Sequence, residues 1–171
     1  MSEAGDCGVD DKRPLFVEPR SHHERAEICT SRAKYRDGRR PTAVKQVFTI
    51  SDESRYLLVH RVPSLKLRDE LTRVCRKFGP LEFVLLAEDY PVSEPFTEVF
   101  VVKYKYLQNA IYAKKRIDDF NFYGETLHVC YAPEMETVDE TKQKLNERET
   151  FVKAKIQRFQ NKAPKRAKLA K

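Results

Sequence analysis

The alternation of hydrophobic and polar positions is regular between about residues 55 and 132. Runs rich in apolar and β-branched residues predict strands at 55–62, 81–88, 97–104 and 126–132. Apolar residues spaced three and four apart predict two helices. The first runs from Ser64, a good N-cap, to Phe78, and the second from about Leu107 to Phe120. This β-α-β-β-α-β order predicts an α+β, ferredoxin-like fold, in which a four-stranded antiparallel sheet has both helices on one face and the other face open.

The segments before this unit follow other patterns. Residues 1–30 are polar, contain Pro14 and Pro19 and show no sustained periodicity, which predicts an arm that is disordered or ordered only on a partner. Residues 31–50 form a basic stretch that ends in "AVKQVFTI" (43–50), which predicts a short extra edge strand. The folded domain itself is then expected to span residues 51–134.

A helix is predicted over residues 135–160, after the domain. Thr137 and Glu140 have the spacing of a capping box, and Val138, Leu145, Val152 and Phe159 recur every seven residues. This interval predicts a narrow apolar stripe on one side of the helix. Residues 161–171 form a basic, disordered tail.

Charge is distributed unevenly along the chain. The 171 residues carry a net charge of +7, and a hydrophobic fraction of 40% is enough for one core. Residues 1–30 carry −3, residues 31–50 +5, residues 51–134 −1 and residues 135–171 +6. Because attraction to nucleic-acid phosphates scales with the cations near them, the flanking segments are the candidates for it.

Several function classes are disfavoured. The four cysteines form no C-x-x-C pair, which argues against a zinc knuckle or a disulfide framework. No apolar run approaches the length of a membrane span, about 18 residues, and the polar start lacks the centre of a signal peptide, so we expect a soluble intracellular protein without a membrane partner. There is no glycine-rich phosphate loop and no recognisable catalytic arrangement. We therefore expect no enzyme, with neither catalytic residues, cofactor nor metal.

Two motifs identify a more specific fold. "KFGPLEFV" and "YGETLHVCYA" resemble the second-strand and fourth-strand regions of the RNA recognition motif (RRM), and the resemblance covers about residues 55–133. In that family three aromatic side chains on the open sheet face stack on RNA bases. This sequence has Leu58, Val99 and Val101 at those positions. Since each stacked base is worth about 1–3 kcal/mol, we expect the open face to bind RNA weakly.

The same three residues, with Cys130 on the neighbouring strand, predict an apolar patch that something covers. The cover is either the chain's own N-terminal arm or C-terminal helix, or a partner protein. Leu145 and Val152 of the predicted helix are further candidates for partner binding. His60 and His128 are expected to face outward on adjacent strands, where they either form a polar rim or, with Arg61, contact RNA. A metal pair of these histidines is disfavoured because no third ligand has a recognisable spacing.

The stretch "SRAKYRDGRRP" (31–41) then becomes the main candidate for RNA binding. Gly38 after Asp37 predicts a turn that folds the two basic halves together. A solvated charge run or a nuclear-localisation signal is the alternative explanation. Side chains that can neutralise phosphates or, for the tyrosine, stack on a base are Arg32, Lys34, Tyr35, Arg36, Arg39, Arg40 and Lys45.

Three long segments narrow the resemblance further. "TSRAKYRDGRRPTAVKQVFTI", "DYPVSEPFTEVF" and "LHVCYAPEMETVDETKQKL" resemble the RNA-binding motif protein 48 family. The resemblance implies a nuclear protein of the minor spliceosome, which removes U12-type introns. It also implies contact with small nuclear RNA near its capped 5′ end, an armadillo-repeat partner and other spliceosome components. The alternative is a protein-interaction RRM that scaffolds a ribonucleoprotein without contacting RNA directly.

Overall fold

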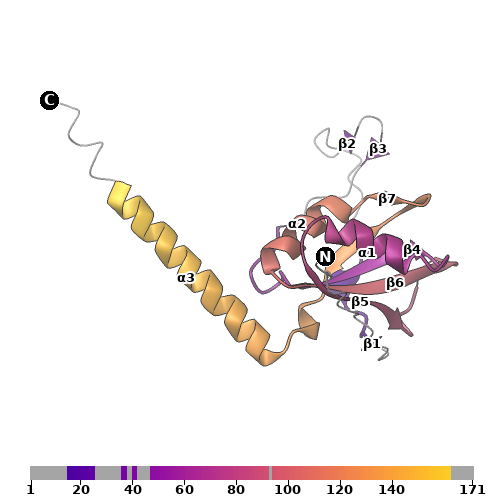
Figure 1. The fold of residues 1–171 in the computed structure, drawn as a ribbon, viewed down its shortest axis with the longest axis horizontal. Helices are drawn as coiled ribbons and strands as arrows, with labels where there is room; N and C mark the ends of the chain where they lie inside the picture. The colour runs from indigo at the N-terminus through magenta and orange to yellow at the C-terminus, as the bar shows by residue number, and fades with distance from the viewer. Residues whose placement is uncertain (1–14, 26–35, 38–39, 42–46, 93, 163–171) are drawn as a thin grey trace, which may run out of the picture. The chain divides into compact units, whose positions relative to one another are not determined.

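The structure is a computed structural model that describes residues 15–25, 36–37, 40–41, 47–92 and 94–162. The chain divides into two compact units, residues 1–135 and 136–171, which are considered separately. The elements (Figure 1) are β1 Leu15–Phe16, η1 Ser21–His23, β2 Arg36–Asp37, β3 Arg40–Pro41, β4 Tyr56–Pro63, α1 Arg68–Arg76, β5 Leu81–Glu88, β6 Thr97–Tyr104, α2 Leu107–Ile117, β7 Asn121–Phe122, β8 Glu125–Thr126, β9 His128–Tyr131, η3 Pro133–Met135 and α3 Val138–Lys162.

The main sheet has the strand order β1-β5-β6-β4-β9. Strands β5, β6, β4 and β9 are antiparallel to their neighbours, whereas β1 joins the edge in parallel to β5 (Figure 1). Leu71 of α1 and Ile117 of α2 pack in the same cluster as Leu57 and Phe100 of the sheet. Both helices therefore cover one face, and the predicted ferredoxin-like RRM fold is confirmed.

Side chains alternate between two separate clusters along β6. Phe100, Val102 and Tyr104 lie in the cluster beneath the helices, whereas Val99 and Val101 lie on the other face. The Tyr104 hydroxyl donates a hydrogen bond of 2.9 Å to the carbonyl oxygen of Cys75, which ties β6 to the end of α1. The register predicted from the sequence is therefore confirmed.

Both domain helices are shorter than the sequence predicts because tertiary hydrogen bonds compete at their ends. Ser64 does not cap α1: its hydroxyl donates to the carbonyl of Phe96 at 2.9 Å, and the helix begins at Arg68. Helix α2 ends at Ile117, three residues before the predicted Phe120. Asp118 leaves the helical conformation, and its carboxylate accepts hydrogen bonds from the Val129 N–H at 3.0 Å and from Lys114 Nζ at 3.1 Å.

The extra strand predicted at 43–50 is not found where the structure describes that segment, because residues 47–50 are irregular or in a turn. The ring of Phe48 instead packs edge-on against Tyr131, with ring centroids 5.0 Å apart. The fourth strand of the RRM is also shorter than predicted, since the hairpin of β7 and β8 precedes it. Tyr123 and Gly124 form the turn of this hairpin, with φ angles of 50° and 95°.

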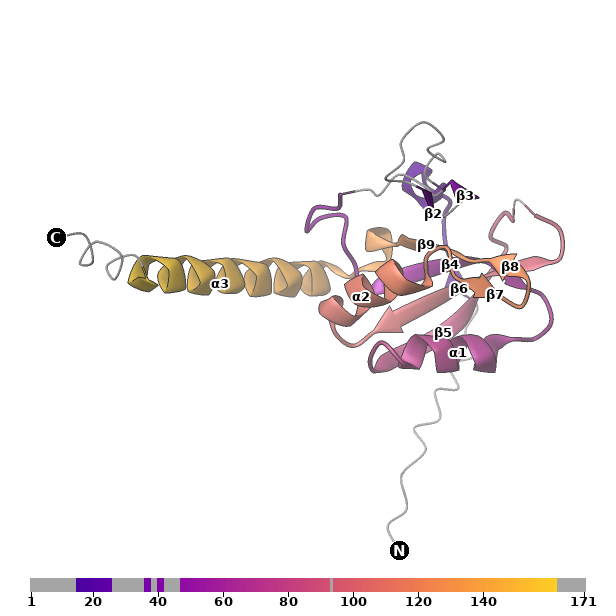
Figure 2. The ribbon, with the colours of Figure 1, turned by 90° about the horizontal axis from the view of Figure 1, so that it is seen from above.

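Helix α3 is one uninterrupted helix of 25 residues (Figure 2). Its capping box is formed: the Thr137 N–H donates to Glu140 Oε2 at 3.0 Å, and the Glu140 N–H donates to Thr137 Oγ1 at 3.3 Å. No helix within the described residues combines the length and apolarity that a bilayer crossing requires. Along α3 the large apolar side chains are 39–70% exposed; they are Val138, Leu145, Phe151, Val152, Ile156 and Phe159.

We expect Asp118→Asn to lower the free energy of unfolding at neutral pH, by about 1.5–3 kcal/mol for the loss of charge-assisted hydrogen bonds. Burial raises the pKa of Asp118, but hydrogen bonds and charges from His128, Lys114 and Val129 outweigh burial and hold this pKa below its usual range. The contribution of Asp118 to the free energy of unfolding is therefore fully present above the pKa of an aspartate in the unfolded chain, about 3.9. It is lost as the pH falls through the lower pKa that Asp118 has in the folded protein.

Urea unfolding between pH 3 and pH 7 tests this expectation. The difference between the wild type and Asp118→Asn should shrink as the pH falls toward 3. Asp139→Asn is the matched control, since its carboxylate is 96% exposed and lies 3.9 Å from Lys142. A constant difference across this range would exclude the proposed role of the Asp118 carboxylate.

Candidate nucleic-acid interface

The face of the sheet that points away from the helices carries the apolar patch that the sequence predicts. Leu58 is paired with Val101 on one side and with Cys130 on the other, and Val99 lies on the same face. The exposed fractions of Leu58, Val99, Val101 and Cys130 are 0%, 3%, 0% and 4%. The patch exists, but its residues are buried, so they do not form an open surface in this structure.

Residues 15–25, which we name the covering segment, lie over this face. The segment begins with β1, where Leu15 pairs with Ala87 and Phe16 with Glu88. Val17 then inserts into the cluster that contains the patch, and Met135 contributes from η3. Of the alternatives that the sequence leaves open, the chain's own N-terminal residues are thus seen to cover the face. The arm predicted as disordered or partner-ordered is here ordered on its own domain over residues 15–25.

Polar contacts at His23 fix the far end of the covering segment. The His23 side chain is 2% exposed. The backbone N–H of Arg20 donates to His23 Nδ1 at 3.2 Å, and Tyr90 Oη also contacts this nitrogen at 3.0 Å. Because a backbone N–H can only donate, Nδ1 is the acceptor and the ring proton is on Nε2. His23 Nε2 therefore donates to Glu134 Oε1, which lies 2.7 Å away.

His60 and His128 lie beneath the covering segment. His128 Nε2 donates to the carbonyl oxygen of His23 at 2.9 Å. The His60 ring lies between His128 and Tyr90, with centroid separations of 5.3 Å to each, and its Nε2 is 3.4 Å from Cys130 Sγ. Burial, with the nearby His128 and His23, lowers the pKa of His60 to about 3. His60 is therefore uncharged at neutral pH, and both histidines face the covering segment.

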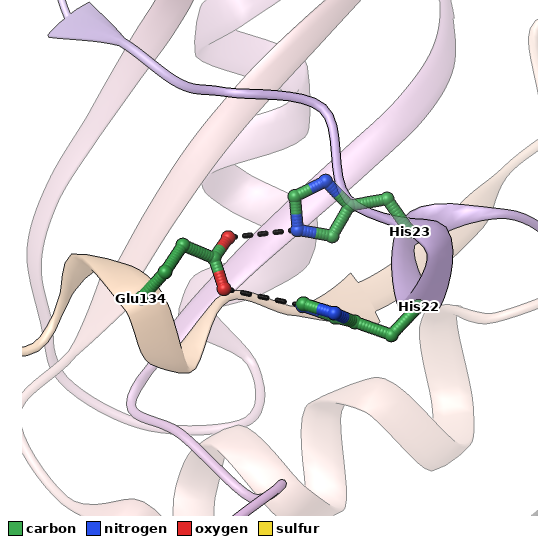
Figure 3. Close-up of side chains that lie close together, drawn as sticks. All are labelled: His22, His23 and Glu134. Atoms are coloured by element: carbon green, nitrogen blue, oxygen red, sulfur yellow. Dashed lines mark hydrogen bonds and ion pairs between the residues drawn. The ribbon is translucent and has the colours of Figure 1, made fainter.

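All four histidines of the sequence meet at this place, since His22 lies beside His23 in η1. His22 Nε2 is 3.1 Å from Glu134 Oε2, so one carboxylate contacts both neighbouring rings (Figure 3). The analysis of sequence patterns misses His22, His23, Tyr90 and Glu134. A usable signal was the apolar triplet Leu15 to Val17 followed by two adjacent histidines within a polar arm.

Arg61 lies at an irregularity of β4, between the residues where the pairing with β6 shifts register. Its φ angle of 66° is unusual for a non-glycine residue and redirects its side chain. Arg61 Nε is 2.9 Å from Glu94 Oε2, and its NH2 group is 3.7 Å from Glu125 Oε2. Two carboxylates thus offset the charge of Arg61, and a phosphate has to compete with them.

Of the basic stretch, residues 31–50, the structure describes 36–37, 40–41 and 47–50, and strands β2 and β3 occupy Arg36–Asp37 and Arg40–Pro41. These pairs form an antiparallel ladder, with Arg36 opposite Pro41 and Asp37 opposite Arg40. The ladder brings the two sides of the stretch together. Arg32, Lys34, Tyr35, Gly38, Arg39 and Lys45, which the sequence analysis also singles out, lie outside the described residues.

Curated proteins named RNA-binding protein 48 are similar to this chain over 131 residues, or 77% of its length. Identity is 49% to the protein of Rattus norvegicus and 47% to those of Homo sapiens and Danio rerio. The match spans about a third of these relatives, 35% of each. No family model matches the chain.

Solved RRM structures are similar over about half of the chain. The third RRM of Pes4 is 23% identical, with 49% of this chain and 98% of that chain covered and a TM-score of 0.42. The RRM of Rna15, solved with bound RNA (GU), is 11% identical, with 50% and 89% covered and a TM-score of 0.41.

We expect Val17→Asp to release the covering segment, because a carboxylate buried among Leu58, Val99 and Val101 without a partner costs several kcal/mol. Amide hydrogen exchange should accelerate in residues 15–25, and binding of a hydrophobic dye should increase. Phe16→Asp is the matched control, since Phe16 is 67% exposed. Equal exchange protection in the wild type and in Val17→Asp would show that Val17 does not hold the segment.

Proposed function

Because this chain belongs to the RNA-binding protein 48 family, we propose that it is a non-catalytic RNA-binding protein of the nucleus that acts in pre-mRNA splicing. In this proposal it works in the minor spliceosome, on U12-type introns. It contacts small nuclear RNA near the capped 5′ end through residues 31–50. It also docks an armadillo-repeat protein and further spliceosome components.

The single observation that carries this proposal is the burial of the sheet face. An RRM holds unpaired bases on exposed aromatic rings, each worth about 1–3 kcal/mol. Here Leu58, Val99 and Val101 stand at the stacking positions, and all three are at most 3% exposed beneath the covering segment. The usual route for RNA is therefore both chemically weakened and physically covered, which supports a route through another segment.

Charge supports the basic stretch as that segment. Residues 31–50 carry a net charge of +5, whereas residues 51–134 carry −1. Arginine guanidinium groups bind phosphate oxygens bidentately, and this geometry also suits a phosphate-rich 5′ end. The ladder between β2 and β3 supports a compact basic element in place of an extended one.

We expect the triple variant R36A/R39A/R40A to bind RNA more weakly and with less sensitivity to salt. For single strands, the slope of log affinity against log salt concentration should fall in magnitude by about 2 when three phosphate contacts are removed. Fluorescence anisotropy of a short labelled single-stranded RNA, with and without a 5′ cap, measures both quantities.

The matched control is R73A/R76A/K77A, which removes three exposed basic side chains at the end of α1. It has the same loss of net charge as the test variant, so a non-specific electrostatic effect would weaken both equally. Equal affinities for R36A/R39A/R40A and the wild type would refute the assignment of RNA binding to the basic stretch.

The second candidate function, a protein-interaction RRM that scaffolds a ribonucleoprotein without touching RNA, is favoured by α3. Leu145 is 45% exposed and Val152 39%, and Ile156 continues the apolar surface at 50%. Apolar side chains gathered on an otherwise charged helix mark a protein contact. We propose Leu145 and Val152 as residues that dock the armadillo-repeat partner.

The double variant L145D/V152D should therefore lose that partner while it keeps its fold, which circular dichroism checks. Co-purification from nuclear extract, with the armadillo-repeat chains quantified by mass spectrometry, measures the loss. Q143D/T150D is the control, since its two exposed positions have the same seven-residue spacing on α3. Undiminished recovery with L145D/V152D would remove this face of α3 from the proposal.

A further inference from the structure

Three metal-binding side chains converge where the covering segment meets η3. One donor atom each from His22, His23 and Glu134 lies within 4.8 Å of the other two (Figure 3). His22 and His23 are adjacent in η1, whereas Glu134 follows more than a hundred residues later. The side chains of His22, His23 and Glu134 are 47%, 2% and 20% exposed, so the site is anchored on one side and open to solvent on the other.

We propose that His22, His23 and Glu134 bind a zinc ion through two imidazole nitrogens and one carboxylate. Two neutral imidazoles and a carboxylate are an established ligand set for zinc, with a fourth position left for water. The donor atoms stand 2.7 Å and 3.1 Å apart across the two His–Glu contacts. Ligand atoms on a tetrahedral zinc ion are about 3.3 Å apart, given bond lengths near 2.0–2.1 Å. Each His–Glu pair thus has to separate by a few tenths of an ångström, while the donor atoms of His22 and His23, which lie within 4.8 Å of each other, have to reach a similar spacing.

Tyr90 provides the second interaction that a zinc-bound histidine requires. A histidine that binds metal through Nε2 carries its proton on Nδ1 and donates it to a neighbouring acceptor. Tyr90 Oη is 3.0 Å from His23 Nδ1 and can accept that bond. On zinc binding the His23 proton moves from Nε2 to Nδ1, so the ring stays neutral and no proton is lost from it. The Arg20 N–H then loses its acceptor at Nδ1, which limits the affinity.

The two remaining histidines do not compete for this role. His128 Nε2 is occupied by the carbonyl of His23, and His60 Nε2 faces Cys130 Sγ. The zinc ion would join η1 to η3 and so hold the covering segment on the sheet. A bound zinc ion would thereby strengthen a cover that the contacts of Val17 and His23 already hold over the positions of Leu58, Val99 and Val101. This inference goes beyond the proposed function and stands without it.

The experiment uses the full chain without a purification tag, freed of metal with a chelator. A calorimetric titration with Zn²⁺ should show one binding site. Co²⁺ bound at the same site should give the visible absorption spectrum of a tetrahedral ion. His22→Ala and Glu134→Gln should each weaken binding at least tenfold, because each removes a zinc ligand. Glu18→Gln is the matched control, since this carboxylate lies in the same segment and is 81% exposed.

A second measurement separates binding from folding. Zn²⁺ should slow amide hydrogen exchange in residues 15–25 of the wild type but leave the exchange rates of His22→Ala unchanged. Because His22 is half exposed, this variant should fold, and circular dichroism checks that it does. Absence of one-site binding tighter than about 100 μM would overturn the proposal. Equal Zn²⁺ affinities for the wild type, His22→Ala and Glu134→Gln would overturn it as well.

Discussion

The contact between Val17 and the outer face of the sheet closes the surface on which an RRM ordinarily stacks bases. Val17 is 8% exposed and fills the space above Leu58 and Val101, which are both fully buried. Burial of such side chains is worth about 1.5–3 kcal/mol each, and the polar contacts at His23 add to it at the other end of the segment. Any ligand that lies across the strands has to break the apolar and the polar contacts together. The residues of the covering segment thus determine whether the outer face of the sheet is accessible to a ligand.

The sequence predicts well those elements that depend on residues close together in the chain. The strand alternation assigns Phe100 and Val101 to opposite faces, and the Thr137–Glu140 spacing identifies the start of α3. The covering segment has no such local cause, because its polar composition, with Pro14 just before it and Pro19 inside it, indicates disorder. Its order depends largely on partners far away in the sequence: His23, for example, contacts Glu134 across 111 residues. The ends of α1 and α2 were missed for the same reason, since hydrogen bonds to Phe96 and Val129 compete with helical ones.

The candidate sites also divide into those that a sequence pattern can indicate and those that depend on contacts between distant residues. A count of charges could identify the basic stretch, and a seven-residue period could identify Leu145 and Val152. No count could show that Arg61 contacts both Glu94 and Glu125 or that His60 lies against Tyr90. Some cations inside the domain are committed to internal partners: Lys114, for example, donates to Asp118 and, at 2.6 Å, to the carbonyl of Val129. Residues 51–134 carry a net charge of only −1, so the proposed attraction for an anionic polymer depends on the flanking residues.

The parallel pairing of β1 with β5 also affects the tendency of this protein to aggregate. The outer edge of a sheet presents unpaired N–H and C=O groups, which can recruit a strand from another molecule and start aggregation. Leu15 and Phe16 occupy that position beside Ala87 and Glu88, near the end of β5. The residues that cover the face therefore also shield part of the edge. Truncation after Val17 would remove both β1 at the edge and the Val17 contact on the face, so a shortened version of the chain should be less soluble at high concentration.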